Sequence, residues 1–230
     1  MWQKAFYYAG RTAVAAYMKL CLQNDVQCPT PLPSGAKIIA ANHPTTNDPF
    51  YITTLIREPM HILVTEGAFD MPFFGAYLHR AGHIPAVRGE GERVLRNAAA
   101  YLQQGHTVTI FPEGALSPVA GGFGRPMTGA VRLALMTGVP VIPVGIHLLA
   151  EKKKVVATQV NGQDTVGIFY PRGPYALTVG RAMRFTGDIH DWEWVRVQTE
   201  RLMQQIAQLS QESAARIRVP QPAVMQTGLA

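Results

Sequence analysis

The chain has 230 residues, of which 47% are hydrophobic and 16% charged, and its formal net charge is +6. A chain of this length and apolar content buries a substantial core within one globular domain, which argues against a disordered protein. The positive charge favours an anionic partner, which includes nucleic acid, a membrane surface or a phosphorylated substrate.

Cysteine content and the N-terminal sequence indicate the cellular compartment that we expect. Cys21 and Cys28 form neither a CxxC pair nor the spread pattern of a disulfide framework, so we expect a reducing, cytoplasmic environment. No apolar run reaches the roughly 18 to 20 residues that a spanning helix requires, and no small-residue cleavage site follows a short apolar core. We therefore expect neither an integral membrane protein nor a secreted one.

Residues 2–22 have the periodicity of an amphipathic helix. The residues near its apolar face are Trp2, Ala5, Phe6, Ala9, Ala13, Ala16, Tyr17 and Leu20. Cations at positions 4, 11 and 19 interrupt the apolar sequence, which suits a helix lying in the headgroup region of an anionic bilayer. A helix packed on the protein core would show the same pattern, so both placements stay open. We treat residues 1–27 as an N-terminal membrane-associating segment.

From residue 28 onward, after a proline-rich stretch up to residue 35, strand and helix patterns alternate. Strands are predicted at 37–41, 61–65, 83–87, 107–111 and 141–147, and helices from residue 48 or 49 and at 72–80, 92–104 and 128–137. This alternation is typical of an α/β domain with a mostly parallel central sheet flanked by helices.

The remaining elements complete a single domain over residues 28–218. Strands at 153–160 and 165–170 flank Asn161-Gly162, a strong hairpin signal. A last strand is predicted at 175–185, and Asp191 is expected to cap a helix that ends near Ile217. We expect residues 219–230 to form a flexible tail.

The first candidate site follows the strand at 37–41, in the segment Asn42-His43-Pro44-Thr45-Thr46-Asn47-Asp48-Pro49. Ligands in α/β folds bind beyond the carboxyl ends of strands. An imidazole titrates near working pH and can take a proton from an alcohol, while a carboxylate fixes its tautomer. His43 and Asp48 are therefore a candidate catalytic pair. The alternative is structural, with Asp48 capping a helix that starts at Pro49 and His43 exposed in a loop.

Two more strand ends carry candidate binding residues. Phe111-Pro112-Glu113-Gly114 ends a buried strand in a turn around one carboxylate. Arg88 follows the strand at 83–87 and precedes a helix, where an arginine and free helix amides together suit a phosphate. Taken singly, each is more often a surface turn residue.

Other function classes lack their signatures. The chain contains no GxSxG nucleophile elbow, no HExxH metal motif, no P-loop and no GxGxxG fingerprint. Nucleic-acid binding would depend only on net charge and on Lys152-Lys153-Lys154, a cluster typical of a solvated turn.

Taken together and in order, NHPTTND, GHIPAVRG, FPEG and GVPVIPVGI resemble the glycerolipid acyltransferase family, best known from the 1-acylglycerol-3-phosphate acyltransferases. The resemblance implies that His43 is the general base and Asp48 its orienter. It also implies that Arg88, Glu113 and Gly114 bind the phosphate-bearing acceptor.

The resemblance further implies an acyl-CoA or acyl-carrier-protein donor, no metal or organic cofactor, and a peripheral site at the cytoplasmic face of a membrane. The expected product is phosphatidic acid from lysophosphatidic acid. Glycerol 3-phosphate or another lysolipid is the alternative acceptor, and a non-catalytic lipid-binding protein is the alternative class.

One departure from the family pattern concerns the acceptor. The family commonly continues FPEG with Thr-Arg-Ser, whereas this chain has Ala115-Leu116-Ser117 and so lacks an arginine expected to contact phosphate. Arg125 and Arg132 are candidate replacements. Asn42 and Thr45 are further candidates for the site.

Overall fold

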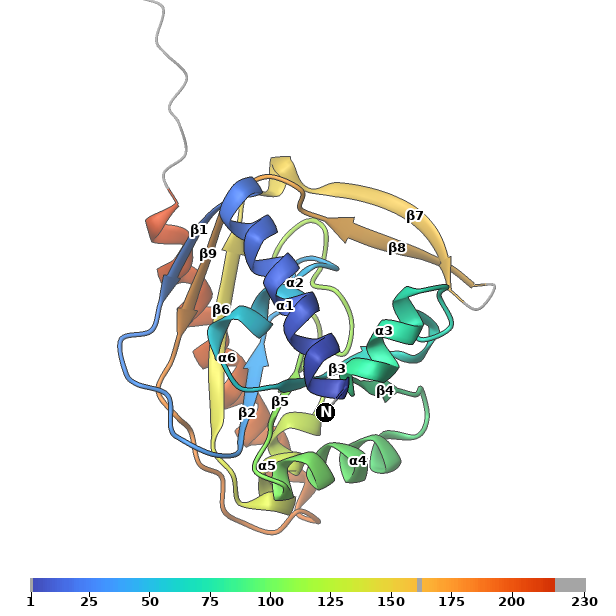
Figure 1. The fold of residues 1–230 in the computed structure, drawn as a ribbon. Coiled ribbons are helices and arrows are strands. Elements are labelled where there is room, and N and C mark those ends of the chain that lie inside the picture. The colour runs from blue at the N-terminus through green and yellow to red at the C-terminus, as the bar shows by residue number, and fades with distance from the viewer. Residues whose placement is uncertain (1, 161–162, 218–230) are drawn as a thin grey trace, which may run out of the picture.

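A computed structural model describes residues 2–160 and 163–217. A seven-stranded sheet with the order β1-β9-β6-β2-β5-β3-β4 forms its centre, and β7 and β8 form a separate hairpin (Figure 1). The strands are β1 (Leu22–Gln27), β2 (Lys37–Ala41), β3 (Met60–Thr65), β4 (Ile84–Ala86), β5 (Thr107–Ile110), β6 (Val141–Leu148), β7 (Lys154–Val160), β8 (Gln163–Phe169) and β9 (Gly173–Val179).

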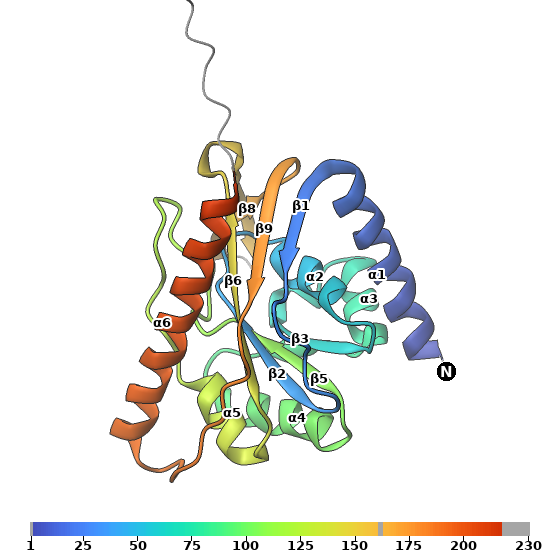
Figure 2. The same cartoon turned by 90° about the vertical axis from the view of Figure 1, so that its left-hand side faces the viewer.

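Helices cover both faces of the central sheet. They are α1 (Trp2–Cys21), α2 (Asp48–Ile52), α3 (Phe74–Ala81), α4 (Gly91–Gln103), α5 (Gly129–Thr137) and α6 (Trp192–Arg216), with short 3-10 turns at Thr53–Leu55, Glu66–Ala68 and Ala150–Lys152. The view in Figure 2 separates α1, α2 and α3 on one side of the sheet from α6 on the other. The α4 and α5 helices share a core cluster with α6.

Strand direction confirms the predicted α/β architecture. β2 pairs in parallel with both β5 and β6, and β3 pairs in parallel with β5 and β4. β9 runs antiparallel to β6, and β1 then pairs in parallel with β9. The sheet is thus mostly parallel, and β2 lies at its centre.

The buried β2 strand divides two apolar cores. Ile38 and Ala40 pack toward α4, α5 and α6, whereas Ile39 and Ala41 pack toward α1 and α2. All four side chains are fully buried, because successive strand residues point to opposite faces and both faces are covered. The central strand therefore places the residues that follow it with little freedom.

Two sequence predictions need correction here. Residues 22–27, assigned to the N-terminal helical segment, form the edge strand β1, whose exposed side chains are polar except for Val26. The last strand ends at Val179 instead of residue 185. At Gly180 the backbone lies so close to Pro143 and Leu209 that a Cβ atom would lie 2.9 Å or less from both side chains.

Helix α1 packs one face on the protein and leaves the other exposed. Tyr7 and Met18 are buried in the core beneath it, and the Arg11 guanidinium donates to the carbonyl oxygens of Thr53 and Ile56 at 3.1 and 3.2 Å. The apolar positions 6, 9, 13, 16 and 20 all face outward, and Leu20 is 83% exposed. Core packing and an exposed apolar stripe therefore coexist on one helix.

The hairpin and the C-terminal helix match their predictions. β7 and β8 pair antiparallel, while the predicted turn at Asn161-Gly162 lies outside the described residues, as does the predicted tail at 219–230. The side chain of Asp191 accepts a hydrogen bond from the Trp194 amide and caps α6. Among residues 2–160 and 163–217, no helix is long and apolar enough to cross a membrane.

Neutral histidines are buried at the amino ends of β3 and β4. The His61 Nδ1 atom lies 2.7 Å from the Gly82 carbonyl oxygen and therefore carries a proton, which leaves Nε2 to accept from His106 at 2.8 Å. His83 accepts from the Ile62 amide through Nδ1. Burial lowers the pKa of His61 and of His83, each from 6.5 to about 4.

These histidines predict loss of stability in mild acid. Because the folded pKa values are depressed, the unfolded chain binds more protons between pH 6.5 and 4, so stability is full above pH 6.5 and falls below it. Each histidine lowers the free energy of unfolding by about 1.4 kcal/mol per pH unit below its unfolded pKa. The thermal midpoint should therefore drop by about 5 to 10 °C from pH 7 to 5.5.

Calorimetry of two variants checks this assignment. Gln at position 83 keeps an acceptor but cannot be protonated, so His83→Gln should flatten the decline, whereas His190→Gln at an exposed position should not. A wild-type midpoint that stays constant over this pH range would contradict the prediction.

Candidate functional site

The candidate site lies where β2 and β5 end at the centre of the sheet. His43 follows β2, Glu113 follows the adjacent β5, and the hairpin of β7 and β8 arches above this edge after β6 (Figure 1). Parallel strands bring their carboxyl ends to one edge, so two motifs separated by about 70 residues meet there.

The Asp48 carboxylate is buried with no exposed surface and accepts four contacts. Oδ1 accepts from the Thr45 hydroxyl and the Tyr175 hydroxyl, both at 2.7 Å. Oδ2 accepts from the Thr45 amide at 2.6 Å and lies 3.3 Å from Nδ1 of His43. The capping alternative fails, because the Asp48 side chain bonds no amide of α2.

The His43 ring is oriented from two directions. Its side chain is 16% exposed, and its ring stacks on Phe111 with centroids 4.2 Å apart and planes at 23°. With Nδ1 directed at Asp48, the proton of the neutral imidazole belongs on Nδ1 and the lone pair on Nε2. This is the arrangement of a general base, and it brings together the two residues that the sequence predicted.

Glu113 holds the main chain around His43. Its Oε1 accepts from the His43 amide at 2.9 Å and from the Ser117 hydroxyl at 2.7 Å, and its Oε2 accepts from the Gly124 amide at 2.6 Å. The Ser117 amide also donates to the His43 carbonyl oxygen at 2.8 Å. Glu113 is buried, so both oxygens are used within the protein.

The other predicted motif residues also have structural contacts. Gly114 has φ +65°, and a Cβ there would lie 2.3 Å from the Met127 sulfur. The Asn42 amide exchanges two hydrogen bonds with the backbone of Ile146 in β6, at 2.9 and 2.7 Å. The Thr45 amide and hydroxyl both donate hydrogen bonds to the Asp48 carboxylate. These residues hold the loop in place at the end of β2.

The hairpin of β7 and β8 is hydrogen-bonded to residues 42–48, the segment after β2 that we call the catalytic loop. The Thr46 amide donates to the Ile168 carbonyl oxygen at 2.7 Å, and the Ile168 amide donates back to the Thr46 hydroxyl at 3.0 Å. The Tyr170 amide donates to Oδ1 of Asn47 at 3.1 Å. The sequence predicted this hairpin but not its attachment to the site.

Two residues near the pair were not predicted. Tyr175 lies on β9, 127 positions from Asp48 in the sequence, and no local pattern marks it. Lys153, taken from sequence as part of a solvated turn, is half-buried. Burial lowers the pKa of its ammonium, and the negative charge of Asp48 acts in the opposite direction.

The predicted arginines occupy separate places. Arg88 is exposed in the turn between β4 and α4, and Arg125 is exposed in the loop after β5. Arg132 lies over the Trp192 ring, 5.1 Å from its centroid. It also borders a hollow of about 580 Å³ at the start of α4, which is lined by residues 89–93, 96 and 132.

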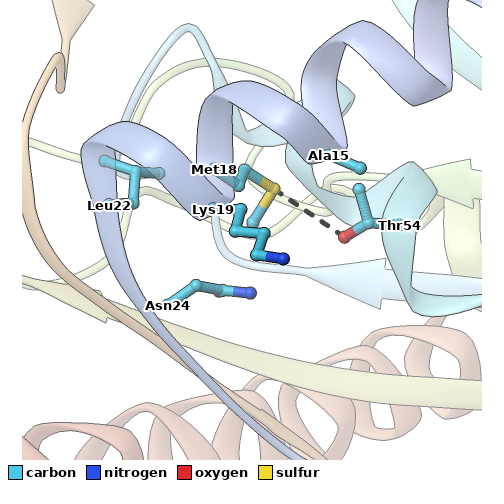
Figure 3. A pocket seen from close by; sticks show the side chains of 6 residues that line it. All are labelled: Ala15, Met18, Lys19, Leu22, Asn24 and Thr54. Carbon is cyan, nitrogen blue, oxygen red and sulfur yellow. Dashed lines mark hydrogen bonds between the residues drawn. The ribbon is translucent and has the colours of Figure 1, made fainter.

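A second hollow, of about 290 Å³, lies beside α1 (Figure 3). Its lining consists of Ala15, Met18, Lys19, Leu22, Asn24 and Thr54. Figure 3 shows the Thr54 hydroxyl directed at the Met18 sulfur, at 3.8 Å. Neither His43 nor Asp48 is among these lining residues.

Comparison with known proteins agrees with this geometry. The acyltransferase family profile matches residues 23–147, more than half of the chain. The chain is 30% identical over 117 residues to a 1-acyl-sn-glycerol-3-phosphate acyltransferase of Pseudomonas aeruginosa, covering 49% of this chain and 45% of that protein. A protein of the same name from Borreliella burgdorferi is 30% identical over 118 residues, with coverage of 48% and 45%. The chain thus matches about half the length of these curated relatives.

A solved structure extends the likeness to the whole fold. The crystal structure of the 1-acyl-sn-glycerophosphate (LPA) acyltransferase PlsC from Thermotoga maritima matches 94% of this chain and 81% of that protein, with a TM-score of 0.64 and 21% identity. The profile match includes the segments of His43, Asp48, Arg88 and Glu113. On this evidence the chain belongs to the acyltransferase family.

Proposed function

We propose that this protein transfers a fatty acyl group from a thioester to the free hydroxyl of lysophosphatidic acid, giving phosphatidic acid. The observation that carries the proposal is the His43–Asp48 pair, which leaves the Nε2 lone pair available on a partly exposed ring. Membership of the acyltransferase family and the names of the relatives support the reaction class and the acceptor.

The proposed mechanism uses the imidazole as base and then as acid. His43 Nε2 removes the proton of the acceptor hydroxyl while its oxygen attacks the thioester carbonyl carbon. The tetrahedral intermediate collapses by breaking the carbon–sulfur bond, and the imidazolium returns its proton to the leaving thiolate. Asp48 stabilises the imidazolium between these steps. The donor, acyl-CoA or acyl-carrier protein, is a substrate, so the chemistry requires no resident cofactor.

Phosphate binding is proposed where β4 ends, at the same edge of the sheet as the pair. Arg88 and the amides at the start of α4 offer positive charge for a phosphate, next to the hollow bordered by Arg132. Lys153, half-buried just before β7, is a further candidate cation for the phosphate. Because the chain lacks the usual arginine after FPEG, glycerol 3-phosphate and other lysolipids are tested as alternative acceptors.

For Glu113 the contacts favour a role inside the protein. An acceptor that bonded its carboxylate would compete with the amides of His43 and Gly124 and the hydroxyl of Ser117. Glu113 and Gly114 thus act on acceptor binding indirectly, because they fix the main chain around His43. The predicted direct contact of Glu113 with the acceptor stays a prediction.

We further propose that α1 lies on an anionic membrane surface at the cytoplasmic face. Its outward stripe at positions 6, 9, 13, 16 and 20 is apolar, and the exposed Lys19 borders the stripe. Apolar residues with flanking cations suit the boundary between headgroups and acyl chains. A peripheral position there would bring the site to its lipid substrates.

The first test replaces the base. His43→Ala should lower turnover about 10²- to 10⁴-fold, because general-base assistance has that size, while the thermal midpoint stays within a few degrees of wild type. The assay follows thiol release from palmitoyl-CoA or palmitoyl-acyl-carrier protein, together with lipid products, and it offers lysophosphatidic acid, another lysolipid, glycerol 3-phosphate or no acceptor. His190→Gln serves as the matched control and should keep full turnover.

The outcomes of this assay separate the candidates. Thiol release that requires lysophosphatidic acid and disappears in His43→Ala supports the proposal. Thiol release that requires glycerol 3-phosphate instead would show that glycerol 3-phosphate is the acceptor. No acceptor-dependent release with either acyl-CoA or acyl-carrier-protein donors would refute catalysis and leave a lipid-binding protein.

A second test asks whether Glu113 acts within the protein. Glu113→Gln replaces one buried acceptor by an NH2 group facing donors, which costs about 1 to 3 kcal/mol and lowers the thermal midpoint by about 3 to 10 °C without substrate. Ser117→Ala removes one of the same bonds and should cost less. An unchanged midpoint together with a raised KM for the acceptor would support direct acceptor binding instead.

The third test concerns the membrane. Deleting α1 would remove Tyr7 and Met18 from the core, so point variants are preferable. Phe6→Glu with Leu20→Glu should reduce co-sedimentation with phosphatidylglycerol vesicles at least several-fold. Met136→Glu with Val197→Glu adds the same charge on α5 and α6 and should have a smaller effect. Equal losses in both double variants would show that net charge, and not the stripe, governs binding.

A further inference from the structure

Tyr175 contributes a hydrogen bond to Asp48 from outside the catalytic loop. Its hydroxyl lies 2.7 Å from Oδ1 of Asp48, and neither side chain has exposed surface. Among the contacts of the described residues, the other hydrogen bonds to this carboxylate come from Thr45 and His43 in the same loop. Tyr175 thus links the loop to β9, which lies beyond the segment matched by the family profile.

The hydroxyl is a donor in this contact. Burial raises the pKa of Tyr175 well above 10, and the negative charge of Asp48 acts in the same direction. The phenol therefore keeps its proton at working pH, and the carboxylate is the acceptor. A bond from a neutral donor to a buried carboxylate is charge-assisted and stronger than a bond between neutral groups.

The surrounding packing fixes the ring. Tyr175 is paired with Leu148 of β6 across the sheet. Its ring meets Tyr51 edge-on, with centroids 5.0 Å apart and planes at 87°. Tyr51 belongs to α2, whose first residue is Asp48. Strand β9 and helix α2 are therefore packed together beneath the carboxylate, and the hydroxyl has one well-defined position.

We propose that Tyr175 is a positioning residue for the His43–Asp48 pair: the Tyr175 hydroxyl holds the Asp48 carboxylate in its orientation toward His43. The role rests on the proposed function, since it matters for catalysis only if His43 is the base. Without this donor, Thr45 alone stabilises the buried charge apart from the imidazole. The carboxylate is then held less firmly toward the ring, and its negative charge, which has lost one donor, attracts the imidazolium more strongly.

The decisive variant is Tyr175→Phe, which removes the hydroxyl and keeps the ring. We expect kcat to fall about tenfold, because the carboxylate no longer keeps the imidazole in the geometry for proton transfer. The acid limb of the kcat/KM profile should move to higher pH by about half a unit or more. In an Asp48→Asn background, Tyr175→Phe should change kcat less than twofold, because its partner carboxylate is gone.

Tyr170→Phe is the matched control. The Tyr170 hydroxyl is also within the buried tyrosine cluster and donates to the Pro174 carbonyl oxygen at 2.8 Å, without contacting Asp48. Its loss should lower the thermal midpoint about as much as the loss of the Tyr175 hydroxyl but leave the acid limb in place. A purely structural role of Tyr175 predicts the same behaviour for both variants, and that result would overturn the proposal.

A readout without substrate keeps this test separate from the proposed function. The rate of carbethoxylation of His43 by diethyl pyrocarbonate, read by peptide mass spectrometry across pH, reports the free imidazole. Tyr175→Phe should shift this pH dependence upward, and Tyr170→Phe should not. If the wild type shows no acyl transfer, the proposed function fails, while this shift still decides whether Tyr175 acts on the pair. An unshifted curve would refute the positioning role.

Discussion

The site depends on one buried charge. An ionised carboxylate without exposed surface is strongly unfavourable unless hydrogen-bond donors surround it, so the chain must bring those donors to Asp48. Three hydrogen bonds, donated by the Thr45 amide, the Thr45 hydroxyl and the Tyr175 hydroxyl, meet that requirement, and the imidazole of His43 completes the set. The need to stabilise this charge ties the loop after β2, the start of α2 and the strand β9 together, and the same bonds orient the imidazole.

A second buried carboxylate works on the main chain of the same histidine. Glu113, at the end of the neighbouring strand, accepts a hydrogen bond from the His43 amide, and the Ser117 amide donates a hydrogen bond to the His43 carbonyl oxygen. Adjacent parallel strands therefore place one carboxylate on the ring of His43 and another on its backbone. With both peptide groups and the ring held, the Nε2 lone pair has a defined direction, which favours proton transfer from a bound alcohol to that nitrogen.

The sequence predicted what depends on local pattern and missed what depends on distant pairing. Alternating strand and helix signals placed β2 to β6. The position of His43 and Asp48 after a strand, together with the resemblance of four ordered motifs, made them a candidate pair. Strand β1 was missed because its polar, exposed residues carry no apolar signal and it exists only through pairing with β9. Tyr175 was missed because its partner lies 127 positions away. The contacts of Glu113 were missed because a turn motif shows that a carboxylate is present, not which groups it bonds.

The central claim is that Asp48 holds the proton on Nδ1 of His43 and leaves Nε2 as the base. The most direct measurement is the long-range nitrogen–proton NMR spectrum of the neutral His43 ring, which distinguishes a protonated from a bare ring nitrogen. We expect a protonated Nδ1 and a bare Nε2 in the wild type, and a mixture of the two tautomers in Asp48→Asn. A wild-type ring protonated on Nε2 would contradict it, because that nitrogen then has no lone pair to accept the proton of an acceptor hydroxyl.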